Sequence, residues 1–233
     1  MTNRGCRSCG GTGYMAEERE GRLFARPCSC RRLHRAERVR QEAAIPERYQ
    51  QRCVLGNYVP AHPSQEEALL VCRRYVEEYP LQGEVQNGLL IMGTCGVGKT
   101  HLAVGILQEV LTAKKMPALF VDLNDLYREI RGTYGKPGAE ETEYDILSPL
   151  VEAPLLLIDE LGCVATPWAQ DTLHYLVSQR YNEQRPTLLT SNYLDAPPRD
   201  EPRLEDRIGT RTRSRLHEMC RTLLVEGPDH RRR

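Results

Sequence analysis

The residues with the clearest chemical potential form a glycine-rich loop in the middle of the chain. Residues 93–100 read GTCGVGKT and match the pattern GxxxxGK[ST] in full. In such a loop the glycines let backbone N–H groups surround phosphate oxygens, Lys99 reaches the β- and γ-phosphates, and the Thr100 hydroxyl faces Mg²⁺. A chance glycine-rich turn is the alternative, but an apolar run precedes this motif and an amphipathic stretch follows it. The predicted phosphate-binding residues are Gly93, Thr94, Cys95, Gly96, Val97, Gly98, Lys99, Thr100 and His101.

An acidic pair supplies the second part of this chemistry. Residues 155–160 read LLLIDE, so four aliphatic residues predict a buried strand with the two carboxylates at its end. There Asp159 can contact Mg²⁺ and Glu160 can polarise an attacking water. A charged turn at the end of a strand is the alternative. Together with the loop, the pair predicts that a nucleoside triphosphate is hydrolysed as well as bound.

Polar and basic residues further along the chain can complete such a site. Asn192 follows the apolar run before it, and the carboxyl end of a parallel strand is where ligands lie, so Asn192 is the first candidate to reach the γ-phosphate and Thr190 the second. Arg207, Arg211 and Arg215 follow each other at intervals of four. On one continuous helix this spacing gives a stripe of guanidinium groups suited to phosphate. An arginine offered to a neighbouring subunit's ATP would make hydrolysis depend on assembly.

Short apolar runs alternate with longer helical patterns after residue 45, which predicts βαβ units and a parallel sheet. The expected strands are 88–92, 118–122, 155–159, 187–191 and 222–225, and the expected helices are 65–79, 99–114, 123–131, 168–183 and 203–218. The Arg-rich, helix-permissive stretch from Leu33 to Ala44 stops at Pro46. We therefore expect two domains, residues 1–45 and 46–233.

The composition excludes several classes of protein. Of the 233 residues, 40% are hydrophobic and 27% are charged, which argues against intrinsic disorder. No apolar run approaches the roughly 18 residues that span a bilayer, and the beginning of the sequence shows no secretory signal, so we expect a cytoplasmic protein. The 32 basic and 32 acidic residues cancel in total, yet residues 1–45 contain 10 Arg and only 5 Glu. Such a basic segment suggests a polyanion or an acidic protein surface as a partner.

Four of the nine cysteines form two close pairs near the start of the chain. In a reducing compartment clustered thiols are more often metal ligands than disulfides. A segment of about 45 residues also needs a metal ion or another cross-link, because it is too small to build a sufficient hydrophobic core. We expect Cys6, Cys9, Cys28 and Cys30 to bind one structural Zn²⁺, with His34 as an alternative to Cys30. The remaining cysteines read as small buried residues, apart from Cys95 in the phosphate loop.

These motifs make residues 45–227 resemble the AAA+ ATPases of the DnaC/DnaI helicase-loader and IstB-like clade. The resemblance lies in the phosphate loop, LLLIDELG at 155–162, TSNY at 190–193 and RTRSRLHEMC at 211–220. It implies that Asp159 and Glu160 act as the Walker B pair and that Asn192 is the sensor 1 residue. It also implies that Arg215, with Arg211 as second choice, is an arginine finger acting in trans within a homo-oligomer.

The resemblance also implies a fold and a function. The fold is a parallel five-stranded sheet in the order 5-1-4-3-2 with helices on both sides. A helix inserted after the second strand contacts single-stranded DNA, for which Tyr127, Arg128 and Arg131 are candidates. The implied function is an ATP-dependent loader of the replicative DNA helicase, docked through an N-terminal zinc module. An IstB-like regulator of a transposase on target DNA is the alternative, and a small-molecule P-loop kinase fits less well.

Overall fold

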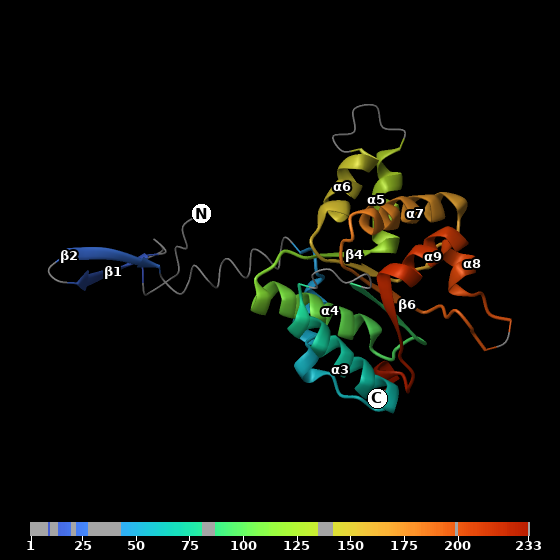
Figure 1. Ribbon diagram of the computed structural model, residues 1–233, viewed down its shortest axis with the longest axis horizontal. Helices are drawn as coiled ribbons and strands as arrows, with labels where there is room; N and C mark the ends of the chain where they lie inside the picture. Colours follow the sequence, from blue (N-terminus) through green and yellow to red (C-terminus); the bar gives the residue numbers. More distant parts are fainter. Residues whose placement is uncertain are drawn as a thin grey trace. The chain divides into compact units, whose positions relative to one another are not determined.

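The computed structural model describes the chain as two compact units, residues 1–42 and residues 43–233 (Figure 1). The described residues are 9, 14–19, 22–27, 43–80, 87–134, 142–198 and 200–232. The first unit contains an antiparallel hairpin of β1 (Tyr14–Arg19) and β2 (Arg22–Pro27), in which Tyr14 pairs with Pro27. The expected domain boundary stays a prediction, although Ala43 and Ile45 are buried in the second unit and the Phe120 N–H donates to the Ala43 carbonyl.

A parallel five-stranded sheet forms the centre of the second unit. Its strands are β3 (Gly88–Met92), β4 (Leu119–Asp122), β5 (Leu156–Asp159), β6 (Thr187–Ser191) and β7 (Cys220–Leu224). They lie in the order β4-β5-β6-β3-β7. Numbered from β3 onward, this is the order 5-1-4-3-2, so the expected fold is confirmed. The strand that leads into the phosphate loop therefore lies between β6 and β7.

Helices cover both faces of this sheet. Figure 1 shows α3 (Pro63–Glu78) and α4 (Lys99–Glu109) on one face. The opposite face carries α5 (Leu123–Thr133), α6 (Glu143–Glu152), α7 (Pro167–Asn182), α8 (Leu204–Ile208) and α9 (Thr210–Met219). Shorter elements are α2 (Glu47–Arg52), the 3₁₀ turns η1 (Leu55–Asn57) and η3 (His230–Arg232), and the π-helical turn η2 (Val110–Lys114) that extends α4. Within the described ranges, no helix is long and apolar enough to cross a membrane.

The core explains why the strand positions could be predicted from apolar runs. Every residue of β3, β5 and β6 is buried. Alternate residues of a strand face opposite sides of a sheet, and Leu90, Leu156 and Leu189 pack against the layer of α5 to α9. Strands buried on both faces read as continuous apolar runs, as β3 and β5 do, whereas β6 has two leucines between buried hydroxyl residues. The sheet thus holds the polar ends of β5 and β6 in fixed positions.

Pro46, at which the helix-permissive stretch 33–44 was expected to stop, is the N-cap residue of a new helix, α2. One helical prediction is corrected by the structure. The single helix expected at 203–218 is instead two helices, α8 and α9, separated by Gly209. Gly209 has φ of 82°, in the left-handed region that favours glycine, and this conformation ends α8 and starts α9 in a new direction.

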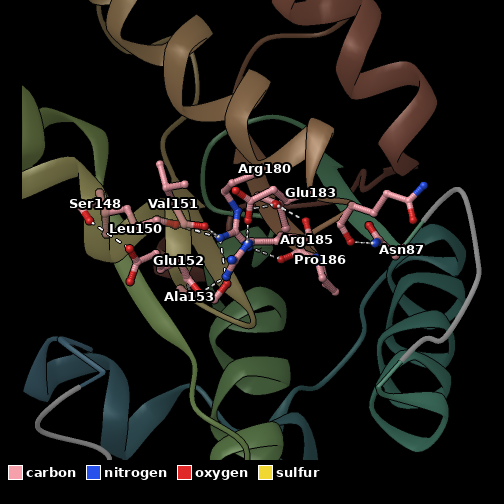
Figure 2. A network of polar contacts seen from close by, with 12 residues as sticks. Asn87, Ser148, Leu150, Val151, Glu152, Ala153, Arg180, Glu183, Arg185 and Pro186 are labelled. Atoms are coloured by element: carbon pink, nitrogen blue, oxygen red, sulfur yellow. Dashed lines mark hydrogen bonds and ion pairs between the residues drawn. The ribbon is translucent and has the colours of Figure 1, made fainter. Parts of the chain in front are cut away.

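A buried arginine joins α6, α7 and the start of β6 (Figure 2). Arg180, on α7, is completely buried, and burial lowers its pKa to about 9. Its guanidinium donates hydrogen bonds to the Thr187 hydroxyl and to the backbone carbonyls of Leu150, Val151, Ala153 and Pro186, at distances of 2.6–3.1 Å. Three of these carbonyls belong to the C-terminal end of α6, where a helix leaves carbonyls without partners and carries a partial negative charge. Arg180 therefore caps α6 from a neighbouring helix.

Candidate nucleotide site

The phosphate loop connects β3 to α4. Backbone hydrogen bonds hold its entrance on both sides, from Gly93 N–H to the Ser191 carbonyl and from Val225 N–H to the Met92 carbonyl. Gly98, with φ of 96°, precedes the first residue of α4. The N-terminal N–H groups of a helix and the loop amides together favour an anion at this position. The local structure that the motif requires is therefore present.

Lys99 begins α4 and is only 7% exposed. Its ammonium group donates a hydrogen bond of 2.7 Å to the Thr94 carbonyl within the same loop. Burial lowers the pKa of Lys99 to about 8, and the negative charge of Asp159 opposes this shift. A desolvated ammonium group without a full counter-charge is a strong attractor for phosphate oxygens.

Asp159, at the end of β5, is 1% exposed and lies next to two hydroxyl groups. The Thr100 hydroxyl donates to Asp159 Oδ1 over 3.0 Å, and the Thr190 hydroxyl donates to the same oxygen over 2.5 Å. Burial raises the pKa of Asp159, while these hydrogen bonds act in the opposite direction. A hydroxyl and a carboxylate oxygen side by side are the ligand types that Mg²⁺ prefers, so Thr100 and Asp159 fit the metal expected with the nucleotide.

Glu160 follows directly and is held by one neighbour from β6 and one from α5. Its backbone has φ of 62°, in the left-handed region that few residues other than glycine adopt, and its N–H donates to the Thr190 hydroxyl over 3.1 Å. Its carboxylate accepts a hydrogen bond of 2.8 Å from the Asn124 side chain. Burial and the charges of Asp122 and Asp159 raise the pKa of Glu160. Asn124 was not predicted from sequence, where it reads as an ordinary residue of a helical first turn.

A single cavity of about 640 Å³ brings most of the predicted residues together. The lining residues predicted from the sequence are Cys95, Gly96, Gly98, Lys99, Thr100, His101, Glu160, Thr190 and Asn192. The loop, the end of β5 and the end of β6 therefore face the same space, as expected for the carboxyl edge of a parallel sheet. The cavity can hold the phosphates of a nucleotide between a cationic side and an acidic side.

Further lining residues come from segments that the sequence did not mark as functional. They are Arg48, Tyr49, Arg52, Cys53, His230 and Arg231. The first four belong to α2 and its C-terminal boundary, and the last two come from the segment after β7. A proline followed by an acidic residue, as at Pro46, is a helix-start signal that could have revealed α2. Nothing in the sequence indicates that residues after β7 return to the cavity.

The three spaced arginines do not form one stripe. The break at Gly209 places Arg207 on α8 and the other two on α9, so the prediction of a single arginine stripe is wrong. Arg207 donates to the carbonyls of Gly162 and Cys163 over 2.9 and 3.0 Å, which makes it a structural residue. Arg211 is exposed and Arg215 is half-buried, and neither lines the cavity. Their role in trans stays a prediction.

Two of the buried nitrogens on α9 have no hydrogen-bond acceptor, Arg213 Nη1 and Arg215 Nε. Arg213 still forms a two-pronged ion pair with Asp195, at 2.6 and 2.5 Å, and these hydrogen bonds lower the pKa of the Asp195 carboxyl. Arg215 lies 5.8 Å from the centre of the Tyr181 ring, and its Nη1 donates to the Arg211 carbonyl. Arg213 thus fixes α9 to the loop after β6.

The expected DNA contacts are only partly accessible. Tyr127 is 4% exposed and its hydroxyl donates to the Ala169 carbonyl, so its ring packs in the core and cannot stack on a base. The Arg128 side chain is exposed beside Asp125. Arg131 lies over the Trp168 ring at 4.7 Å. Basic side chains therefore remain on this surface, but the aromatic platform predicted at Tyr127 is excluded.

The zinc prediction falls mainly outside the described residues. Cys6, Cys28, Cys30 and the alternative ligand His34 lie there, and Cys9 is described by itself. The part of the chain that the structure describes contains no cluster of three or more potential metal ligands of the His, Cys, Asp and Glu types. The zinc site stays a prediction.

Comparison with known proteins agrees with this geometry. The family described as IstB-like ATP binding protein matches residues 81–231. Protein YqaM of Bacillus subtilis is 22% identical over 211 residues, which are 87% of this chain but only 63% of that protein. The ATP-binding protein of insertion sequence IS5376 from Geobacillus stearothermophilus is 32% identical over 110 residues, 46% of this chain and 41% of that protein.

Solved structures extend the comparison to the fold. The DnaC helicase loader has a TM-score of 0.66 and 30% sequence identity, and the match covers 78% of this chain and 100% of that one. DnaI has a TM-score of 0.62 and 24% identity over 80% of this chain and 94% of that one. The first likeness includes sequence, and the second concerns the fold alone.

Proposed function

The chain belongs to the family of IstB-like ATP-binding proteins, and from this membership we propose that it is an ATP-dependent loader of the replicative DNA helicase. In this role it binds ATP and single-stranded DNA and remodels the helicase during the initiation or restart of replication. One observation carries the proposal. The phosphate loop, Glu160 and Asn192 meet in one cavity, with Asp159 hydrogen-bonded to Thr100 beside it, in a fold shared with a 30% identical structure named as the DnaC helicase loader.

The described side chains divide the work of ATP hydrolysis among them. Lys99 and the loop amides bind the phosphates, and Thr100 and Asp159 hold the metal, which supplies charge stabilisation on the phosphate oxygens when it is bound. Glu160, which lines the cavity, accepts a proton from the water that attacks the γ-phosphorus as the bond to ADP breaks. Its pKa, raised by burial and by neighbouring carboxylates, moves toward the range that suits a general base. Asn192 orients the water or the γ-phosphate.

Arg215 is the proposed finger for the ATP of a neighbouring copy. Its position outside the chain's own cavity supports this role. The Arg215→Ala variant should bind ATP as the unaltered protein does but should lose at least about tenfold of its DNA-stimulated hydrolysis, since fingers contribute about 10³-fold or more where they act. Steady-state ATPase rates with single-stranded DNA measure this. Arg207→Ala is not a suitable control because Arg207 holds the Gly162 turn, so Arg203→Ala on the exposed surface serves instead; an unchanged rate in Arg215→Ala contradicts the finger role.

A transposase regulator is the second candidate. The 32% identity to the ATP-binding protein of an insertion sequence favours it, although the match covers less than half of either protein. Both candidates use the same ATPase, so the partner decides between them. The full chain with ATP, and a chain lacking residues 1–45, should each be mixed with the purified replicative helicase or with a transposase from the same genome. Capture of the helicase by the full chain alone supports the loader, and capture of the transposase supports the regulator.

Zinc binding by residues 1–45 is part of the loader proposal. The hairpin supports it, because Tyr14 pairs with Pro27 and the two cysteine pairs flank these residues in the sequence. Elemental analysis of the purified protein should find one Zn²⁺ per chain, and a chain lacking residues 1–45 should contain none. Equal zinc contents in the two proteins contradict the site.

Arg128 and Arg131 are the proposed contacts to the DNA backbone.

A further inference from the structure

The segment after β7 returns across the phosphate loop. We call residues 226–232 the strap. Its first residue is fixed to the start of α3, because the Glu226 N–H donates to the Ser64 hydroxyl over 2.9 Å and this hydroxyl donates to the Glu226 carbonyl over 3.2 Å. Further on, the His230 N–H donates to the Gly96 carbonyl over 3.0 Å. The strap is therefore attached to α3 at Glu226 and to the phosphate loop at His230.

The contact between the strap and the loop is close. Gly96 has φ of 82°, and a Cβ atom built on it would overlap the Asp229 carboxylate. The His230 ring lies 3.3 Å from the side-chain oxygen of Gln65, which is completely buried and also donates to the Val97 carbonyl over 3.5 Å. One buried amide thus joins the strap, the loop and α3. The strap can come this close to the loop because Gly96 has no side chain and because the buried Gln65 amide has hydrogen-bond partners on both sides.

This attachment carries a positive charge to the phosphate end of the cavity. The Arg231 N–H donates to Asp229 Oδ1 over 2.9 Å, which closes a turn, and the exposed Arg231 side chain lines the cavity together with Lys99. Burial is the main influence on the pKa values of both Lys99 and Glu160, lowering the first and raising the second, and the charge of Arg231 acts to lower both. Arg231 therefore faces the residues that meet the terminal phosphates.

Two other arginines, Arg48 and Arg52 of α2, also line the cavity. Arg48 lies over the Tyr49 ring at 4.6 Å, and the charges of Arg48 and Arg52 act on Cys53. The main charges that act on Lys99 and Glu160 include Arg231 but neither of these two. Of the described arginines that line the cavity, Arg231 is the one on a segment that is hydrogen-bonded to the phosphate loop.

We propose that the strap completes the nucleotide site and that Arg231 binds the terminal phosphates of the nucleotide in cis. This inference rests on the proposed function in that the nucleotide is ATP. An arginine can form two parallel hydrogen bonds to a phosphate, which adds to the single point charge of Lys99. Binding of ATP then also holds the strap against the loop.

The test compares three nucleotides on the full chain. Dissociation constants for ATP, ADP and AMP are measured by calorimetry for the unaltered protein, for Arg231→Gln and for Arg231→Lys. Arg231→Gln should weaken ATP binding about tenfold, as expected for a lost hydrogen-bonded charge, and should leave AMP binding unchanged. The ATP affinity of Arg231→Lys should fall between those of the unaltered protein and of Arg231→Gln. Arg221→Gln, on the exposed part of β7, is the matched control and should bind all three nucleotides normally.

Each outcome has a distinct meaning. Equal ATP affinities of Arg231→Gln and the unaltered protein overturn the inference, and tighter ATP binding by the variant overturns it by marking the strap as an obstruction. An equal loss for ATP and AMP also overturns it, because a contact to the terminal phosphates must distinguish them. If the unaltered protein does not bind ATP, the proposed function fails instead. Because Arg231 is exposed, the thermal unfolding of Arg231→Gln should match that of the unaltered protein.

Discussion

Lys99→Ala should weaken ATP binding by about a hundredfold or more. The ammonium group of Lys99 is almost fully buried and donates only to the Thr94 carbonyl within the loop. Removing one partner of a buried, hydrogen-bonded charge pair costs about 2–5 kcal/mol, and 1.4 kcal/mol corresponds to a factor of ten. Calorimetric titration with ATP and Mg²⁺ measures the change.

Lys114→Ala provides the matched control for this result. Lys114 is on η2 and donates to the Glu77 carbonyl outside the cavity, so the same substitution there should leave the ATP affinity unchanged. Burial disfavours the charged form of Lys99, as its lowered pKa shows, so Lys99→Ala should not reduce the free energy of unfolding. ATP binding by Lys99→Ala with the affinity of the unaltered protein would contradict the assignment of the site.

Arg180→Met should lower the free energy of unfolding by about 3–5 kcal/mol. Methionine keeps the length of the side chain but leaves four backbone carbonyls and the Thr187 hydroxyl without their donor, and loss of one side of a buried polar network costs this much. Replacing a buried ion pair can be neutral when both partners become apolar, but backbone carbonyls cannot be replaced. Urea unfolding monitored by circular dichroism gives the value.

Arg185→Met separates this effect from the general loss of an arginine. Arg185 is near Arg180 in Figure 2, where it pairs with Glu183 and donates to the Glu152 carbonyl. Its side chain is 30% exposed, so water can replace its contacts and the expected cost is below about 1 kcal/mol. Equal unfolding free energies for Arg180→Met and the unaltered protein would contradict the capping role of Arg180.

The residues that sequence predicted correctly are those whose environment is local. The phosphate loop follows a strand and starts a helix within one short segment. Strands 88–92 and 187–191 were predicted to the residue, the first from a continuous apolar run and the second from two leucines flanked by hydroxyl residues. Arg180 could not be identified in this way, since its acceptors lie on α6 and before β6, up to 30 residues away in sequence. Asn124 and Arg231 also act through contacts between distant segments.

The one helical error has a simple cause. A single glycine inside a helical pattern costs only about 1 kcal/mol, so the pattern around Gly209 predicted one helix and a stripe of three arginines. The structure uses the freedom of Gly209 to change direction, which sends Arg207 to the Gly162 turn and leaves Arg211 and Arg215 on α9. Residues four apart in the sequence lie on one face only while a single helix continues.

Thr190 gives the site a mechanical property. Its hydroxyl donates to Asp159 and accepts from the Glu160 N–H, and its carbonyl accepts from the Leu161 N–H. Three hydrogen bonds therefore join the end of β6 to the end of β5. Asn192 follows two residues later on the same backbone. A displacement of β6 by a bound phosphate would therefore be transmitted to Asp159 and Glu160, the proposed metal ligand and general base, so that the ends of the two strands move as one lever.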